Sequence, residues 1–137
     1  MADVYSKKKR REIMSRVRSK GTKPEEAVAE ILDSMGVDYT RNVNDLPGCP
    51  DFVVGEKQTV LFVHGCFWHG HRNCSRAKKP GTNARFWDEK ISGNQRRDRR
   101  NARRLRKQGW TVLTVWQCKL RSIKERQKTV RRIKRYL

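Results

Sequence analysis

The chain has 137 residues, and its 34 Lys and Arg against 14 Asp and Glu give a formal net charge of +20. A small soluble domain needs a net charge of only about 2 to 8, so this excess predicts a polyanionic partner, above all nucleic acid. Membrane binding is disfavoured, because no long apolar run, lipidation signal or amphipathic terminal helix with an aromatic face occurs.

The length fits one domain, since domains typically run roughly 100 to 150 residues. Only 35% of the residues are hydrophobic, and so thin a core predicts support from a structural metal. The charged start MADVYSKKKRREIM has no apolar stretch behind it and predicts no signal peptide. We therefore expect a cytoplasmic protein whose four cysteines are metal ligands or thiols rather than disulfides.

The chain begins with a predicted basic arm, residues 1–21, followed by a predicted domain, residues 22–137, that ends in a basic helix. The run from Lys7 to Arg11 suits the phosphate backbone of DNA, and the alternative is a solvated run of charges. We favour the arm interpretation, because the charge excess has one sign and recurs further along the chain.

The stretch TKPEE predicts the start of a helix, with Thr22 as its N-cap and Pro24 in its first turn. The inward stripe of this helix should consist of Val28, Leu32 and Met35. Glu25 shares that stripe and can face the interior or a site, whereas Glu26 points away. Alternatively, Glu25 only closes a capping box with Thr22.

A hairpin is predicted next, with the strands PDFVV and TVLFVH joined by a turn at residues 55–57. In an antiparallel hairpin the start of the first strand lies beside the end of the second, so Asp51 and His64 should meet. A carboxylate and an imidazole at the open end of an apolar hairpin suit a functional site. The alternative is a turn aspartate and a hydrogen-bonded structural histidine.

The stretch HGCFWHGHRNC holds all three histidines and two of the cysteines, and Cys118 follows the predicted strand WTVLTVW. Four of these residues fit a tetrahedral structural zinc site: Cys66, His71, Cys74 and Cys118. A buried thiol is the alternative for Cys118 and for Cys49, and we prefer it only for Cys49. His64 and His69 exceed this ligand set and are available for another role.

Residues 88–108 predict a long helix that ends at Gly109. The inward stripe of this helix should contain Ile91, Asp98, Ala102 and Leu105. An inward carboxylate needs a partner, and the candidates for Asp98 are a neighbouring arginine and a catalytic histidine. The outer arginines either contact a phosphate backbone or form a solvated face.

Five acidic and histidine side chains together predict a hydrolytic site in this basic protein: Glu25, Asp51, His64, His69 and Asp98. In such chemistry a carboxylate holds Mg²⁺, the metal polarises a phosphate, and an imidazole positions or deprotonates the attacking water. The residues therefore indicate a nuclease.

Five motifs in order, LPGCPDFVV, VHGCFWHGHRNC, TNARFWDEKI, NQRRDRR and GWTVLTVWQC, resemble the very-short-patch-repair DNA mismatch endonucleases. The resemblance implies a restriction-endonuclease-like α/β fold, a small mixed β-sheet flanked by helices. It also implies a bacterial, nucleoid-associated protein. The Glu-x-Lys of the wider superfamily is replaced here by Phe62-Val63-His64, as in this family.

The resemblance also implies a role for each site residue. Asp51 and the backbone carbonyl of Val63 would hold Mg²⁺. Glu25, His64 and a His69–Asp98 pair would arrange the attacking water. The implied structural zinc ligands are Cys66, His71, Cys74 and Cys118, and the implied wedges into the duplex are Phe67, Trp68 and Trp87. Ordinary core packing is the alternative for these aromatic residues, and it applies more strongly to Phe86.

The implied activity is nicking of the T-containing strand of T:G mispairs that arise from 5-methylcytosine deamination. The implied partners are double-stranded DNA, mismatch-repair proteins and a companion cytosine-5 methyltransferase, and we expect a monomer. Gln117 and Cys49 depart from the family pattern, which bears on packing or DNA contacts. Two alternatives remain: a same-fold restriction or nicking endonuclease that cuts matched DNA, and a non-catalytic zinc-containing DNA-binding module.

Overall fold

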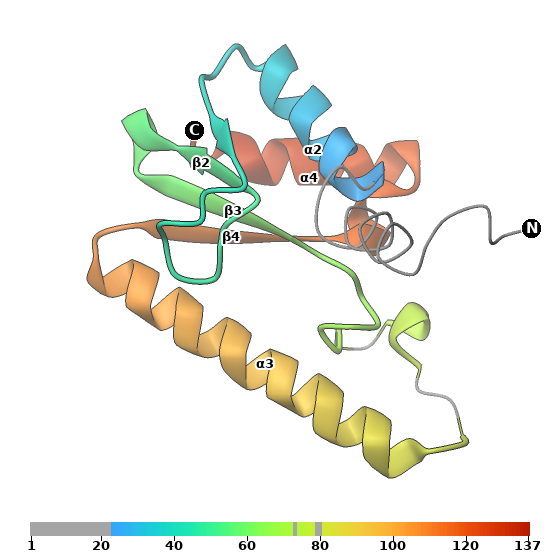
Figure 1. The fold of residues 1–137 in the computed structure, drawn as a ribbon. Helices are drawn as coiled ribbons and strands as arrows, with labels where there is room; N and C mark the ends of the chain where they lie inside the picture. The colour runs from blue at the N-terminus through green and yellow to red at the C-terminus, as the bar shows by residue number, and fades with distance from the viewer. Residues whose placement is uncertain (1–22, 73, 79–80) are drawn as a thin grey trace, which may run out of the picture.

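A mixed four-stranded sheet forms the centre of the protein (Figure 1). The computed structural model describes residues 23–72, 74–78 and 81–137. The strands, in their order across the sheet, are β1 (Thr40–Arg41), β2 (Phe52–Val54), β3 (Thr59–His64) and β4 (Thr111–Trp116). The first two pairings are antiparallel, whereas β3 and β4 pair in parallel and therefore require a crossover connection.

Helices cover both faces of this sheet. In the described ranges the α-helices are α2 (Lys23–Ser34), α3 (Ala84–Lys107) and α4 (Ile123–Lys134), and the 3-10 turns are η2 (Gly55–Lys57), η3 (Ser75–Ala77) and η4 (Gln117–Leu120). Figure 1 shows α2 and α4 on one face and α3 on the other. The expected mixed α/β architecture is thus confirmed. Within the described residues, no helix combines the length and apolar character needed to cross a membrane.

The predicted hairpin is present as β2 and β3, which pair in the antiparallel sense. Phe52 pairs with Leu61 across β2 and β3, and continuing that register places Asp51 opposite Phe62 rather than His64. Alternate residues of a strand share a face, so His64 still projects from the same face as Asp51, one diagonal step away. The two residues therefore lie on the same side of the sheet and line the same cavity, although they are not directly opposite each other.

The crossover helix α3 begins earlier than predicted, at Ala84 rather than at residue 88. Its N-cap is Asn83, a residue type favoured at that position, although its backbone is left-handed with φ of 57° and its side chain makes no cap hydrogen bond. The end agrees with the prediction, because Gly109 follows the helix with a φ of 93°. The predicted arm, residues 1–21, and the predicted N-cap Thr22 lie outside the described residues.

Two buried layers hold the helices to the sheet. Under α2 and α4 the layer includes Val28, Leu32, Phe52, Leu61, Val115 and Ile133. On the other face, Leu105 of α3 packs with Val53 and Val60. This second layer is smaller and involves only the C-terminal part of α3, which leaves the rest of the helix for other contacts.

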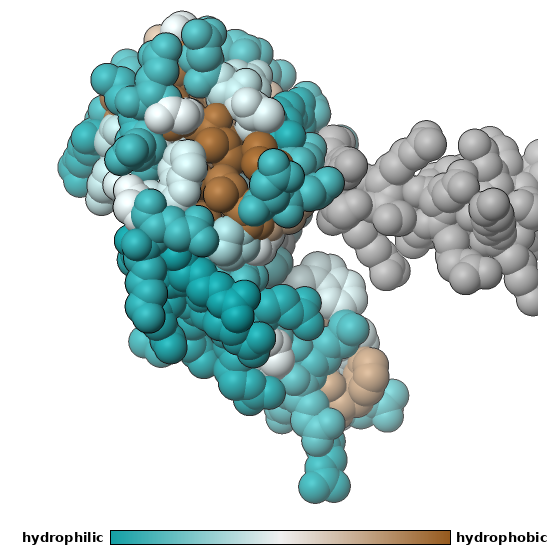
Figure 2. Space-filling model, turned by 60° about the vertical axis from the view of Figure 1, so that its left-hand side comes forward, coloured by the Kyte–Doolittle hydropathy of each residue, from teal (hydrophilic) through white to brown (hydrophobic). Residues whose placement is uncertain are grey.

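The helix α3 is longer than the strands of the sheet that it covers. Its 24 residues span about 36 Å, whereas the six residues of β4 span about 20 Å. The N-terminal part of α3 therefore projects past the sheet and runs beside the loop that follows β3 (Figure 1). Its exposed side chains include Arg96, Arg97, Arg99, Arg100, Arg103 and Arg104. Figure 2 shows hydrophilic side chains over most of the face it presents, with a hydrophobic patch among them in the upper part and a paler one near the lower end.

Candidate active site and metal centre

A cavity of about 770 Å³ lies where α3 faces the sheet. Its lining includes all five residues expected in the hydrolytic site: Glu25, Asp51, His64, His69 and Asp98. Three arginines of α3 also line it: Arg99, Arg103 and Arg106. Acidic groups and imidazoles thus share a cavity whose wall is basic, which suits a phosphate diester.

Asp51 lies directly before β2, at the sheet edge of the cavity. Its Oδ2 accepts a hydrogen bond of 2.7 Å from the backbone N–H of Val63. The pKa of Asp51 is raised to about 7, mainly by burial and also by the nearby charge of Glu25, while the Val63 hydrogen bond opposes this rise. A cation placed between the two carboxylates would favour their ionised forms.

Glu25 is buried at 4% exposure, while the side chain of its neighbour Glu26 is 52% exposed. The predicted inward orientation of Glu25 is confirmed, and the capping-box alternative involves Thr22, which is not described. Arg41 of β1 was not identified from the sequence. Its Nη2 lies 2.8 Å from Glu26 Oε1 and 3.8 Å from Glu25 Oε2, and its guanidinium lies over the ring of Phe52.

The oxygen atoms of Asp51 and Glu25 fit a hard divalent cation. Magnesium is usually held by one or two protein carboxylates together with water and substrate phosphate oxygens, rather than by a complete protein cage. Two carboxylates that line a cavity open to a phosphate meet that description. The donor set therefore fits Mg²⁺.

The two histidines of the cavity stack on each other at the end of β3. The rings of His64 and His69 lie 3.8 Å apart between centroids and are inclined by only 3°. Burial and the nearby His69 lower the pKa of His64 to about 4, so His64 is neutral at physiological pH. Asp98 Oδ2 lies 2.6 Å from His69 Nδ1, so the partner of the inward carboxylate is a histidine rather than an arginine.

A second cluster, separate from His64 and His69, brings together the four residues expected to bind zinc: Cys66, His71, Cys74 and Cys118. Their ligand atoms all lie within 4.8 Å of one another, and Cys118 Sγ is 3.4 Å from His71 Nδ1. Tetrahedral zinc would hold a sulfur and a nitrogen roughly 3.6 Å apart, so the spacing fits this metal. The ring of His71 also stacks on Trp116 at 4.1 Å, which fixes its orientation.

The thiols of this cluster affect one another. The pKa of Cys118 is raised to about 12, first by burial and then by hydrogen bonds and charge from Cys66 and Cys74. None of the four cysteines of the chain, all of which are described, forms a disulfide. A raised pKa favours the protonated thiol. Zinc bound at this cluster would favour the deprotonated thiolate instead, because the thiolate is the form that binds zinc.

Cys49 lies outside that cluster, as expected, but it is exposed rather than buried. Its Sγ donates a hydrogen bond of 2.9 Å to Asn44 Oδ1, and its backbone is left-handed with φ of 50°. It contributes to the rim of the cavity. The interpretation of Cys49 as a buried thiol is therefore wrong, because the loop turns its side chain outward before Pro50.

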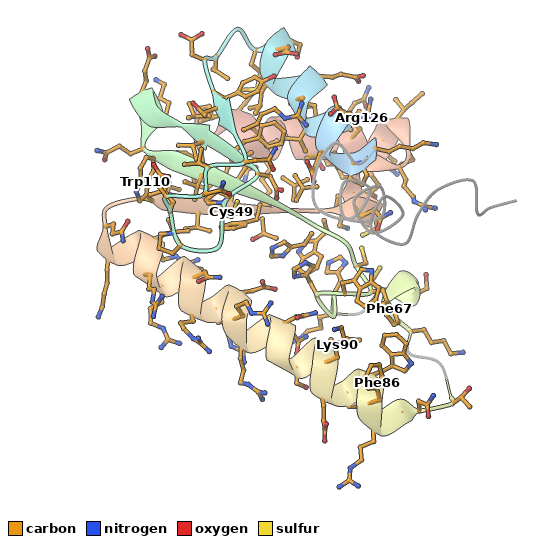
Figure 3. The ribbon with its side chains drawn as sticks, in the orientation of Figure 1. Cys49, Phe67, Phe86, Lys90, Trp110 and Arg126 are labelled. Atoms are coloured by element: carbon orange, nitrogen blue, oxygen red, sulfur yellow. The ribbon has the colours of Figure 1, made fainter. Side chains whose placement is uncertain are left out.

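The proposed wedge residues form an aromatic group away from the sheet. The centroids of Phe67 and Trp68 lie 5.2 Å apart, and those of Phe67 and Trp87 also lie 5.2 Å apart. Trp68 is 40% exposed and Phe86 is 56% exposed, and none of these aromatic residues belongs to a buried core layer. Core packing is thus the wrong account of Phe86. Figure 3 shows Phe67 and Phe86 near the projecting end of α3, with Cys49 and Trp110 toward the other end.

One face of α3 contacts the loop after β3 through amides that the sequence interpretation missed. Asn94 Nδ2 donates to the carbonyl of Trp68 at 2.9 Å, and Gln95 Nε2 donates to the carbonyl of Gly70 at 3.1 Å. Their spacing from Asp98, one helical turn on, was the available signal, because residues at i, i+3 and i+4 share a face.

The known proteins that this chain resembles in sequence and in structure are DNA endonucleases. Residues 2–76 match the family model described as DNA mismatch endonuclease Vsr. The chain is 46% identical to the DNA mismatch endonuclease Vsr of Escherichia coli (strain K12), over 88% of this chain and 77% of that protein. It is also 46% identical to the type II nicking enzyme V.XorIIP of Xanthomonas oryzae pv. oryzae, over 88% of each. The catalytic domain of the homing endonuclease I-Bth0305I superposes with a TM-score of 0.56 at 25% identity, covering 85% of this chain and 94% of that one.

Proposed function

We propose that this chain, which belongs to the Vsr family of DNA mismatch endonucleases, nicks the T-containing strand of T:G mispairs left by 5-methylcytosine deamination. One observation carries the proposal: exposed Trp68, suited to enter a base stack, is adjacent in sequence to His69 of the hydrolytic cavity. Inserting an apolar ring between base steps requires unstacking, which costs less at a mispair.

Asp51 is the residue that would hold Mg²⁺, with the Val63 carbonyl as a further ligand, and the nearby Glu25 would help to arrange the attacking water. When bound, Mg²⁺ polarises the phosphate and stabilises the leaving oxygen. Asp98 accepts the Nδ1–H of His69 and so leaves Nε2 as the proton acceptor for the attacking water. His64, which is neutral, packs against the His69 ring and orients it without adding charge.

Zinc is the metal we assign to Cys66, His71, Cys74 and Cys118. The first three of these residues flank or follow the aromatic pair Phe67 and Trp68, while Cys118 follows β4. Binding of all four would tie the loop after β3 to the neighbouring strand end. The restriction-endonuclease-like fold class belongs to the same proposal, since the Asp51 hairpin lies at the centre of a mixed sheet.

The basic outer face of α3 and the arm at residues 1–21 are the proposed contacts with the DNA backbone. Arginines on this helix would neutralise phosphates, and the affinity they supply would fall with salt regardless of sequence. The recognition of the mispair and the affinity for the duplex thus reside in different residues.

A second candidate is nicking of perfectly paired DNA. It is favoured by the name of the Xanthomonas relative, which is a type II nicking enzyme. The two candidates predict the same metal chemistry and differ only in whether a T:G pair is required.

The test uses one duplex with a T:G pair and its matched control, each strand carrying its own label, with Mg²⁺ added or omitted. We expect Mg²⁺-dependent cleavage of the T-containing strand alone. Asp51→Asn should abolish cleavage while duplex binding survives, because a charge that holds the cation is lost. Asp45→Asn, a change of the same kind at an exposed loop position, should cut normally. Equal cleavage of the matched duplex would select the second candidate.

A further inference from the structure

Loop 65–71, the segment that follows β3 and ends at His71 of the zinc cluster, rests on one face of α3. Asn94, Gln95 and Asp98 of this face contact three consecutive loop residues: the Trp68 carbonyl, the Gly70 carbonyl and the His69 ring. Of these three contacts, only the one with His69 involves a loop side chain, whereas the other two are made to backbone carbonyls.

We propose that Gln95 is a positioning residue for the hydrolysis: by fixing the Gly70 carbonyl it holds His69 in contact with Asp98 and His64. This inference rests on the proposed role of His69 in the cleavage reaction. Gln95 would not touch the reacting atoms in this role, and its effect would pass through the loop backbone.

The loop is built to transmit such a constraint. Backbone hydrogen bonds join His69 to Gly65, Gly70 to Phe67, and His71 to Cys66, at 3.2, 3.2 and 2.9 Å. These bonds make the loop one compact unit rather than a flexible link. A displacement at Gly70 therefore moves the backbone of His69 as well.

The side chain of Gln95 packs so closely on Gly70 that no larger residue fits at this position without a shift. A Cβ added at Gly70 would lie 2.3 Å from Gln95 Nε2 and 2.8 Å from Ile91 Cγ2. Gly70 has a φ of +59°, a backbone conformation that favours glycine. The loop backbone at Gly70 therefore packs directly on the side chains of Gln95 and Ile91, and the Gln95 amide helps to set the separation of helix and loop.

His69 needs such support, because its side chain is 27% exposed and burial alone does not fix it. Its side-chain contacts include the 2.6 Å approach to Asp98, the stack on His64 and an edge contact with the ring of Trp116. Misplacing a catalytic group by about 1 Å can lower a rate roughly 10²-fold. Loss of the Gln95 amide should therefore lower the cleavage rate by up to roughly 10²-fold.

A direct contact with DNA is the competing role for Gln95, because this residue also lines the cavity. The two roles differ in their dependence on His69. A residue that acts through His69 has no effect once His69 is absent, whereas a direct DNA contact contributes independently.

The test measures kcat and KM of the full, zinc-loaded chain on the T:G duplex with Mg²⁺, for Gln95→Ala and Gln95→Met. We expect kcat to fall roughly 10- to 100-fold with KM within about twofold of wild type. In a His69→Ala background the same changes should lower kcat no further. Gln108→Ala, which changes an exposed glutamine just past the end of α3, should leave both parameters unchanged. Additive losses in the double variant, or a raised KM with kcat unchanged, would overturn the inference.

Imidazole nitrogen resonances of the zinc-loaded protein, recorded without DNA or Mg²⁺, give a readout that needs no activity. The ring resonances of His69 should shift in Gln95→Met, which keeps side-chain length but lacks the amide, while those of His71 stay in place. Unshifted His69 resonances would refute the positioning role and leave the proposed nuclease intact. A wild-type rate in His69→Ala would instead refute the assigned role of His69, and the positioning inference with it.

Discussion

Replacing Asp51 with Asn should stabilise the protein against unfolding at alkaline pH in the absence of divalent cations. Burial raises the pKa of Asp51 from 3.8 to about 7 in the folded chain. The folded state therefore resists ionisation of this group, and the stability contributed by the neutral form is lost as pH rises through about 7. Asn remains neutral throughout, and its Oδ1 can still accept the Val63 N–H.

The size of the effect follows from the shift, which is roughly three units, at 1.36 kcal/mol per unit. The gain in the free energy of unfolding should approach about 4 kcal/mol at pH 8 and fall to about 2 kcal/mol at pH 5.5. Adding Mg²⁺ should narrow the difference at pH 8, because the cation binds the folded wild type and not the variant.

Urea unfolding at the two pH values, in buffer depleted of divalent cations by a chelating resin, measures this difference. Zinc content is determined on the same samples, so that loss of the structural metal is not mistaken for the effect. Asp45→Asn serves as the matched control and should change stability little at either pH. If Asp51→Asn raised the free energy of unfolding equally at both pH values, or did not raise it at pH 8, Asp51 would not be a buried carboxylate with a raised pKa.

Cys118→Ser should lose zinc and melt at a lower temperature, whereas Cys49→Ser should keep both properties; full zinc occupancy in the Cys118 variant would remove that residue from the cluster. His69→Ala should slow cleavage of the T:G duplex roughly 10² to 10⁴-fold while gel-shift affinity persists, and an unchanged single-turnover rate would contradict its role. Trp68→Ala should reduce the preference for T:G over matched DNA by about 1 to 3 kcal/mol and leave the salt dependence of binding nearly unaltered. If folded, zinc-loaded Trp68→Ala retains the wild-type preference, the proposed insertion into the duplex fails.

Much of the candidate site was accessible from the sequence, because local periodicity decides which way a side chain points. The helical stripe that carries Val28 and Leu32 also carries Glu25, and all three are buried. The stripe of α3 likewise turned Asp98 inward toward its histidine. In both helices an acid among apolar positions was the informative signal.

Other features depend on contacts that periodicity does not encode. The strand β1 has only two residues, so Arg41 lacked a strand pattern that would have placed it beside Glu25. The left-handed backbone at Cys49 turns its thiol outward, and neither residue type nor spacing indicates that conformation. The start of α3 was placed four residues too late, at residue 88 rather than Ala84, although Asn83 before it is a residue type favoured at the N-cap.

The parallel pairing of β3 with β4 has a consequence for how the chain folds. Partners such as Thr59 and Thr111 lie about 50 residues apart in sequence, so this pairing must wait for the long crossover to collapse, and such non-local steps are slow. The cysteine cluster spans the same gap, because Cys66 follows β3 and Cys118 follows β4. Zinc that is first bound by the ligands after β3 would then bind Cys118 and so hold β4 beside β3 once the two strands have paired. The supply of metal during synthesis would then govern how fast the protein matures as well as how stable it becomes.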